Sequence, residues 1–274
     1  MDPAHAGALA VLGALTGLLG TILGVGGGVF LVPVLVLWCG VDMAHAAATG
    51  LIAVIATSNA AAADNVEKGV ANVRLGMVME TATVSGALGG GWLAAVLPTR
   101  AVIGLFGALL LGVSLLLWRR RPEEDGAAPG GPTGPFDGSY VDAAEGRTVT
   151  YTARNIPGGL GASLAAGSLS GLLGVGGGIL KVPAFHIICG LPMKAAAATS
   201  NYTIGVTAAA GAAVYLARGA VDAPVAAAVA LGVLAGSKAG AYANQRLGSD
   251  SVRRLFAALT LVLAVQMLRK AAHG

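Results

Sequence analysis

One glycine-rich motif occurs twice in the chain and is the strongest candidate for chemistry. Residues 24–33 read GVGGGVFLVP and residues 174–183 read GVGGGILKVP, identical at seven of ten positions. Consecutive glycines free the backbone to take positive φ. A helix that begins just after such a turn directs its positive dipole end and free N–H groups into the break, which suits a small anion. The alternative is a packing kink where two helices cross. The predicted anion-binding residues at the turns are Gly26, Gly27, Gly28, Gly176, Gly177 and Gly178.

Two lysines within apolar segments are further candidates. Lys181 lies three residues after Gly178, where the first copy of the motif has Leu31. A lysine inside a membrane is costly, and here its expected partner is the bound anion. Lys238 is eight residues before Arg246 and is a second substrate-binding candidate. For both lysines the alternative is a long side chain that extends to the membrane surface.

Polar residues after each motif complete the expected site. Thr49, Thr199, Ser200 and Asn201 lie near the start of the next helix, and hydroxyl and amide donors suit an oxyanion. The alternative role is hydrogen bonding between helices. Glu80 can bind a coupling proton if it is buried. Its separation of six residues from Arg74 favours an interfacial position instead.

Composition indicates that most of this chain lies in lipid. It is 55% hydrophobic and 11% charged, with a mean hydropathy of +0.77, whereas soluble domains carry about 25% charged residues. The net charge of +4 fits basic cytoplasmic loops better than nucleic-acid binding. No paired carboxylates, nucleophile–base pair, metal-ligand cluster or cofactor motif is evident, so we expect no enzyme, no cofactor and no metal.

The apolar segments predict an all-α polytopic membrane protein. Residues 7–41 carry no formal charge over 35 positions, too many for one span of about 20 residues. We therefore expect helices broken at the glycine motifs, with three unbroken helices after each. The expected broken elements are 8–39 and 158–189, and the expected unbroken helices are 44–63, 75–97, 101–118, 195–216, 223–245 and 251–268.

Matching positions 150 residues apart define two homologous repeats. We predict a first transmembrane repeat at 1–121, a polar cytoplasmic linker at 122–156 and a second repeat at 157–274. Most of the linker reads as flexible, while residues 146–154 favour a short strand or hairpin. Parallel and inverted repeats place nearly equal numbers of loop lysines and arginines inside, so charge leaves both open. Inverted repeats are the commoner transporter architecture, and we favour them.

The doubled GVGGG-(V/I)-x-x-VP motif resembles the sulfite exporter TauE/SafE family of membrane transporters. Residues 154–158 (RNIPG) and 198–201 (ATSN) carry the same resemblance. It implies transport of a small anion such as sulfite, an organosulfonate, or another sulfur-containing or carboxylate anion. Where the second repeat has Thr199-Ser200-Asn201 the first has Thr49-Gly50-Leu51, so the polar site is expected to be asymmetric.

The expected function is secondary transport of a small anion by alternating access, and a passive anion channel is the alternative. The expected location is the inner cell membrane, crossed several times. The expected partners are the anion and the lipid bilayer, without nucleic acid. A coupling proton or cation and a homodimer are left open.

Overall fold

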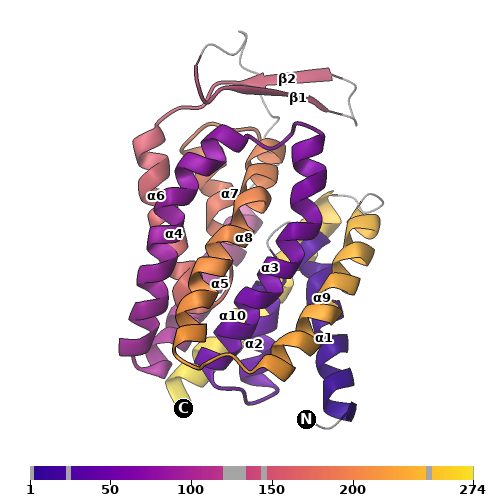
Figure 1. The fold of residues 1–274 in the computed structure, drawn as a ribbon, viewed down its shortest axis with the longest axis vertical. Coiled ribbons are helices and arrows are strands. Elements are labelled where there is room, and N and C mark those ends of the chain that lie inside the picture. Colours follow the sequence, from indigo (N-terminus) through magenta and orange to yellow (C-terminus); the bar gives the residue numbers. More distant parts are fainter. Residues whose placement is uncertain (1–2, 23–25, 120–133, 143–146, 245–248, 274) are drawn as a thin grey trace.

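The computed structural model describes residues 3–22, 26–119, 134–142, 147–244 and 249–273. Ten helices and one two-stranded sheet lie within these residues (Figure 1). The first half contains α1 (Pro3–Ile22), α2 (Gly28–Leu37), α3 (Met43–Glu67), α4 (Val73–Val96) and α5 (Thr99–Arg119). The second contains α6 (Ile156–Leu173), α7 (Gly178–Ile187), α8 (Met193–Ala217), α9 (Ala223–Asn244) and α10 (Ser249–His273).

The predicted helical architecture is confirmed, including a helix break at each glycine motif. Both breaks separate a long helix from one of 10 residues. Three segments of the described residues are long and apolar enough to cross a membrane: Thr99–Leu116, Ile156–Leu173 and Ala223–Gly240. Gly24 and the expected flexible residues 122–133 lie outside the described residues.

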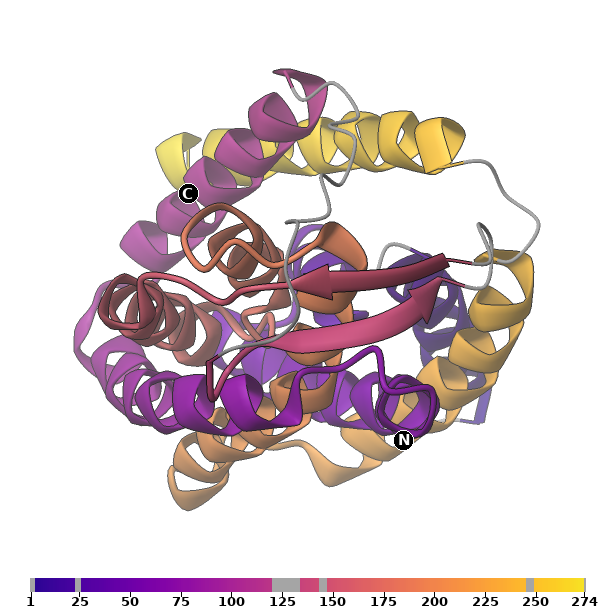
Figure 2. The same ribbon diagram turned by 90° about the horizontal axis from the view of Figure 1, so that it is seen from above.

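One part of the linker prediction was wrong, because Gly138–Asp142 forms a strand rather than a flexible segment. This strand, β1, pairs antiparallel with β2 (Arg147–Tyr151), and Tyr140 lies opposite Val149. Figure 2 shows the hairpin lying across one end of the helix bundle. Apolar side chains on one face of it pack on α4, α7 and the start of α8, and their burial stabilises a pairing that two strands alone would barely hold. Burial also raises the pKa of the Tyr151 phenol above its usual value.

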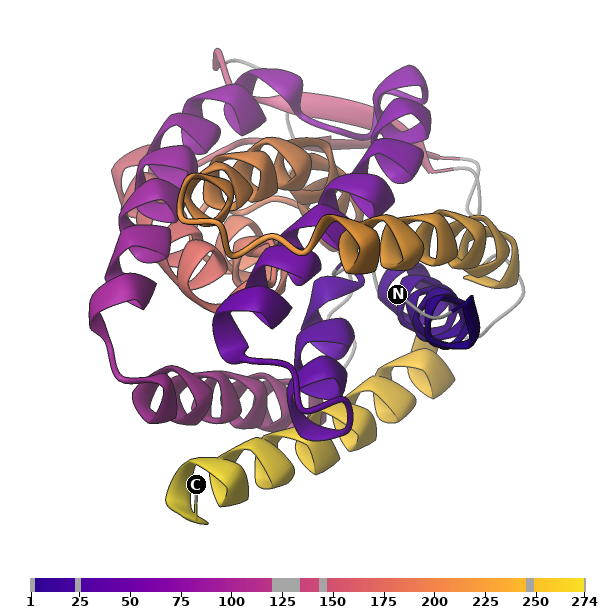
Figure 3. The same cartoon turned by 60° about the horizontal axis from the view of Figure 1, so that its bottom comes forward.

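The second broken element enters and leaves at the hairpin end. The Arg154 amide, just before α6, donates a hydrogen bond of 2.9 Å to the carbonyl of Cys189, just after α7. The first broken element lies at the other end. There the Lys270 ammonium, near the end of α10, donates a hydrogen bond of 2.6 Å to the Val36 carbonyl in α2. Both chain termini lie at this second end (Figures 1 and 3).

Equivalent helices of the two halves therefore run in opposite directions. The Asn72 amide donates a hydrogen bond of 2.9 Å to the Thr199 hydroxyl, so α4 and α8 begin at the hairpin end. Because α8 has 25 residues, it is about 37 Å long, and α9 begins at the opposite end. Helix α1 runs parallel to α9, since Gly13 lies against Val229 and Gly17 against Val233.

In each half, the second helix after the broken element packs against the first helix of the other half. Helix α4 packs along α6, and α9 packs along α1. A methyl group at Gly86 would overlap the Leu164 carbonyl oxygen, and one at Gly236 would overlap the Ala14 carbonyl oxygen. These two contacts are equivalent, because 86 and 236, like 14 and 164, differ by 150. The sequence repeat is thus also a repeat of helix contacts, made possible by small residues that let backbones approach.

We expect Gly90→Ala to lower the free energy of unfolding by about 1–3 kcal/mol, the usual cost of overpacking. A methyl group there would overlap the Ser168 carbonyl oxygen and force α4 away from α6. The measurement is the thermal unfolding midpoint in detergent. Gly89→Ala is the matched control, because nothing lies within 4 Å of the added methyl and alanine favours the helix. Equal midpoints for the two variants would contradict this close packing.

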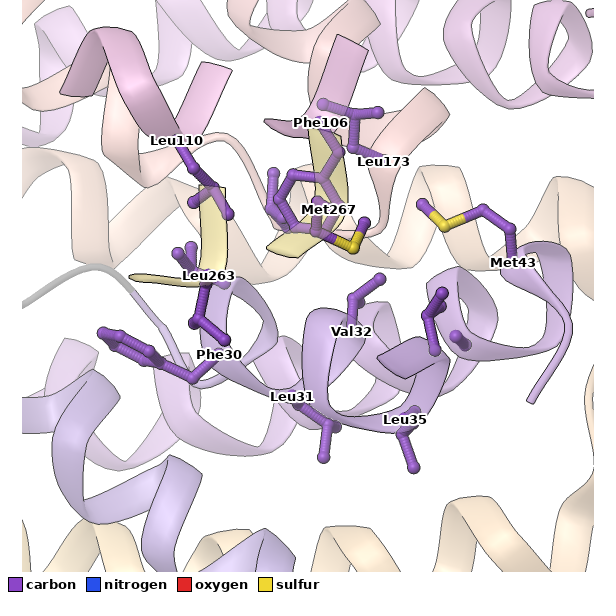
Figure 4. Packing of buried hydrophobic residues seen from close by; sticks show 14 of the residues in the cluster. Phe30, Leu31, Val32, Leu35, Met43, Phe106, Leu110, Leu173, Leu263 and Met267 are labelled. Carbon is purple, nitrogen blue, oxygen red and sulfur yellow. The ribbon is translucent and has the colours of Figure 1, made fainter. Parts of the chain in front are cut away.

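A hydrophobic core surrounds α2, the first short helix. Phe30, Leu31 and Leu35 of α2 are almost completely buried. They belong to one cluster with Phe106 of α5 and Met267 of α10, among others (Figure 4). Helix α2 is therefore held from several directions by apolar contacts, which fixes the glycine turn that precedes it.

Candidate functional site

Helix α7, the second short helix, places a charged side chain in the protein interior. Lys181 lies in the first turn of α7 and has no exposed surface. Its ammonium forms an ion pair of 2.6 Å with the Glu80 carboxylate of α4. It also donates hydrogen bonds to Thr203 at 2.8 Å and Thr207 at 3.2 Å, both in α8. The zero exposure excludes the alternative in which Lys181 extends to the membrane surface.

The four side chains form one closed polar cluster. Thr207 donates a short hydrogen bond to the second carboxylate oxygen of Glu80, so both oxygens of that carboxylate are occupied. An ammonium has three N–H donors, and all three of Lys181 are used within the cluster. The cluster is therefore electrically neutral and saturated with hydrogen bonds, as a buried ion pair must be to offset its desolvation.

Two parts of the chain that are far apart in sequence build this cluster. Glu80 comes from the first half, while Lys181, Thr203 and Thr207 come from the second. The equivalent positions in the other repeat are Ala230, Leu31, Ala53 and Thr57. Three of these four residues are apolar, so the charged cluster has no counterpart at the equivalent positions of the other repeat.

The second glycine turn lies directly before α7. Gly174, Gly176 and Gly177 have φ of 78°, 74° and 79°, values that side chains rarely adopt. Gly177 is the N-cap of α7, so the first amides of that helix lie at this turn. The Ser170 side chain lies beside Gly177. Its hydroxyl is buried without a hydrogen-bond partner among the described residues, and so is that of Ser200.

The two glycine turns lie against each other. A methyl group at Gly28 would lie 2.8 Å from the Gly174 carbonyl oxygen. Gly26 and Gly176 both lie beside the Val54 side chain of α3. A small cavity with room for little more than one water molecule adjoins the first turn. Its lining includes Gly20, Thr21, Gly26, Thr57, Ser58, Asn201 and Ile204.

The remaining predicted site residues divide into three groups. Ser200 and Asn201 are close to the turns, the first as a buried unpaired hydroxyl and the second in the cavity lining. Thr49 and Thr199 are buried, but Thr49 donates to the His45 carbonyl and Thr199 accepts from the Asn72 amide. Lys238 is exposed on α9, two residues from the glycines that face α1. The structure does not bring Lys238 to the Lys181 cluster.

Comparison with known proteins identifies the chain. The family described as sulfite exporter TauE/SafE matches residues 9–267. The chain belongs to the sulfite exporter TauE/SafE family. It is also similar to the "Probable membrane transporter protein YunE" of Bacillus subtilis (strain 168), with 26% identity over 268 residues that cover 95% of this chain and 96% of the relative. No solved structure matches it.

Membership of the TauE/SafE family confirms the resemblance and two further expectations. The protein is a membrane transporter, and it is not an enzyme. Part of the surface of a membrane protein lies in lipid, which accommodates exposed apolar side chains. Exposed apolar residues such as Leu15, Trp92 and Val96 are then in a favourable environment rather than on an unstable surface.

Sequence reasoning missed all three side-chain partners of Lys181 in this TauE/SafE transporter. The interfacial position expected for Glu80 was wrong, because Glu80 is only 8% exposed and pairs with Lys181. In this structure the charged partner of Lys181 is Glu80, and anion binding at Lys181 stays a prediction. A usable signal was present: Glu80 is the only carboxylate in the apolar part of any expected helix. A buried lysine needs a counter-charge.

Proposed function

We propose that this protein is a secondary transporter that moves a small anion by alternating access. The substrate class is sulfite, an organosulfonate, or a related sulfur-containing or carboxylate anion. The observation that carries the proposal is a lysine with no exposed surface in the first turn of α7, beside a glycine turn with positive φ. In this reading the expected location is the inner cell membrane, crossed several times.

The chemistry of this region favours an anion over a cation or a neutral solute. Lys181 supplies a full positive charge, and the start of α7 adds its dipole and its first amides. The unpaired hydroxyl of Ser170 is a further donor beside Gly177. Ser200 offers another donor one turn before Thr203 in α8. Such a donor set suits the oxygens of a sulfite, sulfonate or carboxylate group.

The arrangement of the halves supports alternating access. Equivalent helices run in opposite directions, and the charged cluster joins α4 of one half to α7 and α8 of the other. Movement of one half relative to the other would therefore change the surroundings of Lys181, as in transporters with inverted repeats. The complete burial of Lys181 fits a closed state in which the site is open to neither side.

Transport into liposomes tests the function and separates it from a channel. We expect purified protein in liposomes to take up labelled sulfite or isethionate, and to exchange labelled for unlabelled anion without net flux. A passive channel would instead show electrical conductance and no exchange against a gradient. Liposomes without protein are the control. Absence of uptake and exchange for sulfite, isethionate, sulfoacetate, thiosulfate and short carboxylates would refute the substrate class.

A further inference from the structure

Every donor of the Lys181 ammonium is occupied in this structure, and this decides how an anion can reach it. Glu80, Thr203 and Thr207 accept its three hydrogen bonds. An incoming anion must therefore replace one of these acceptors. Glu80 is the negatively charged one, and it belongs to the other half of the molecule. It already holds the position on Lys181 that an anionic oxygen of the substrate would take.

We infer that Glu80 is a tethered competitor of the transported anion and leaves Lys181 by taking up a proton. The inference rests on the proposed function, because it assumes that an anion binds at Lys181. In the exchange, the ion pair between the Glu80 carboxylate and the Lys181 ammonium is broken. One monoanion takes the place on the ammonium, and one proton from solution joins the carboxylate to give a neutral carboxylic acid. One anion and one proton are then bound together.

Charge balance in the buried cluster is the reason for the coupling. The resting cluster holds one negative and one positive side chain, so its net charge is zero. Adding a monoanion alone would leave a net charge of −1 in a region of low dielectric, which is strongly unfavourable. Protonation of Glu80 restores zero, because the anion then carries the only negative charge beside Lys181. The protonated Glu80 also gains a donor, with the Thr207 hydroxyl beside it as an acceptor.

Other titratable groups on the surrounding helices do not offer the same compensation. On α4, Arg74 is exposed. On α7, His186 Nδ1 hydrogen-bonds the Leu191 carbonyl. On α8, Lys194 is exposed and the Tyr215 hydroxyl donates to the Leu172 carbonyl, while Tyr202 lies beside Gly76 of α4. Helix α6 carries no titratable side chain. Among the described residues, Glu80 is thus the carboxylate placed to bind the proton.

The number of protons that the unmodified protein takes up when it binds an anion tests the inference. Isothermal titration calorimetry with isethionate is run in buffers of different ionisation enthalpy, because a sulfonate keeps its charge across the pH range used. We expect about one proton taken up per anion, and the isethionate Kd should rise about tenfold per pH unit where Glu80 is ionised in the free protein. A binding enthalpy that is the same in every buffer, together with an isethionate Kd that does not change with pH, would overturn the inference. That result would leave the proposed function intact.

A variant that lacks the charge of Glu80 tests whether this residue binds the proton. Glu80→Gln should bind isethionate with no proton uptake and with a Kd that no longer changes with pH. Glu67→Gln is the matched control, since Glu67 is exposed at the end of α3, and it should keep the proton uptake of the parent. Persistent proton uptake in folded Glu80→Gln would assign the proton elsewhere and overturn the inference. Failure of the parent to bind any anion tested would refute the proposed function itself.

Discussion

Lys181→Gln is expected to abolish anion transport and to lower anion affinity more than about a hundredfold. Removing one partner of a buried ion pair typically costs about 3–5 kcal/mol, and here it leaves the Glu80 carboxylate buried with the Thr207 hydroxyl as its partner. Leu31→Ala is the repeat-matched control. It removes a fully buried side chain at the equivalent position and should reduce stability without changing anion affinity. Affinity is measured alongside the unfolding midpoint, so that misfolding is not mistaken for lost binding.

A double variant separates the structural role of the lysine from its binding role. Replacing both Lys181 and Glu80 by apolar residues of similar volume, as in Lys181→Met with Glu80→Leu, removes both buried charges. Such replacements are often neutral or stabilising, so the unfolding midpoint should recover while anion binding stays absent. Lys181→Arg keeps the charge but alters its geometry, and we expect intermediate affinity. Transport by Lys181→Gln at the rate of the parent would show that backbone and hydroxyl donors alone hold the anion.

Short-range patterns in the sequence predicted the helices and the broken elements well. Long apolar segments predicted every helix, and the two glycine motifs predicted both breaks. The ends differ by a few residues, because polar residues continue a helix beyond its apolar part, as Asp64 and Glu67 do at the end of α3. Strand β1 was missed because its stability comes from packing of the hairpin on α4 and α7 rather than from its own sequence.

The partners within the site could not be predicted from spacing in the sequence. Lys181 and Glu80 are 101 positions apart, and their meeting depends on the packing of α4 from one half among helices of the other. The repeat offset was uninformative here, because the equivalents of Lys181 and Glu80 are Leu31 and Ala230. The doubled glycine motif pointed to α7, which carries Lys181, and the packing of α4 on α8 brings the counter-charge of Glu80 to it.

Gly176→Ala is expected to lower the free energy of unfolding by roughly 2–5 kcal/mol and to impair transport. Two effects add. The residue has φ of 74°, which costs a side chain about 1–2 kcal/mol. The new methyl group would also overlap the Val54 side chain of α3, and overpacking adds about 1–3 kcal/mol. Because Gly176 immediately precedes the N-cap of α7, relief of the overlap would shift the start of that helix and the position of Lys181.

Two further variants divide the effect of Gly176→Ala into its parts. Gly219→Ala has a similar φ of 68° and nothing within 4 Å of the added methyl, so it should show the backbone cost alone and transport normally. Val54→Ala removes the two side-chain carbons that the new methyl would meet most closely and leaves Ile204 Cγ1 at 3.2 Å. Combined with Gly176→Ala, it should lose less stability than the sum of the single changes, a coupling that a double-mutant cycle measures. Additive losses would mean that this glycine turn is not packed against the other half of the molecule, and the close contact between the repeats would have to be abandoned.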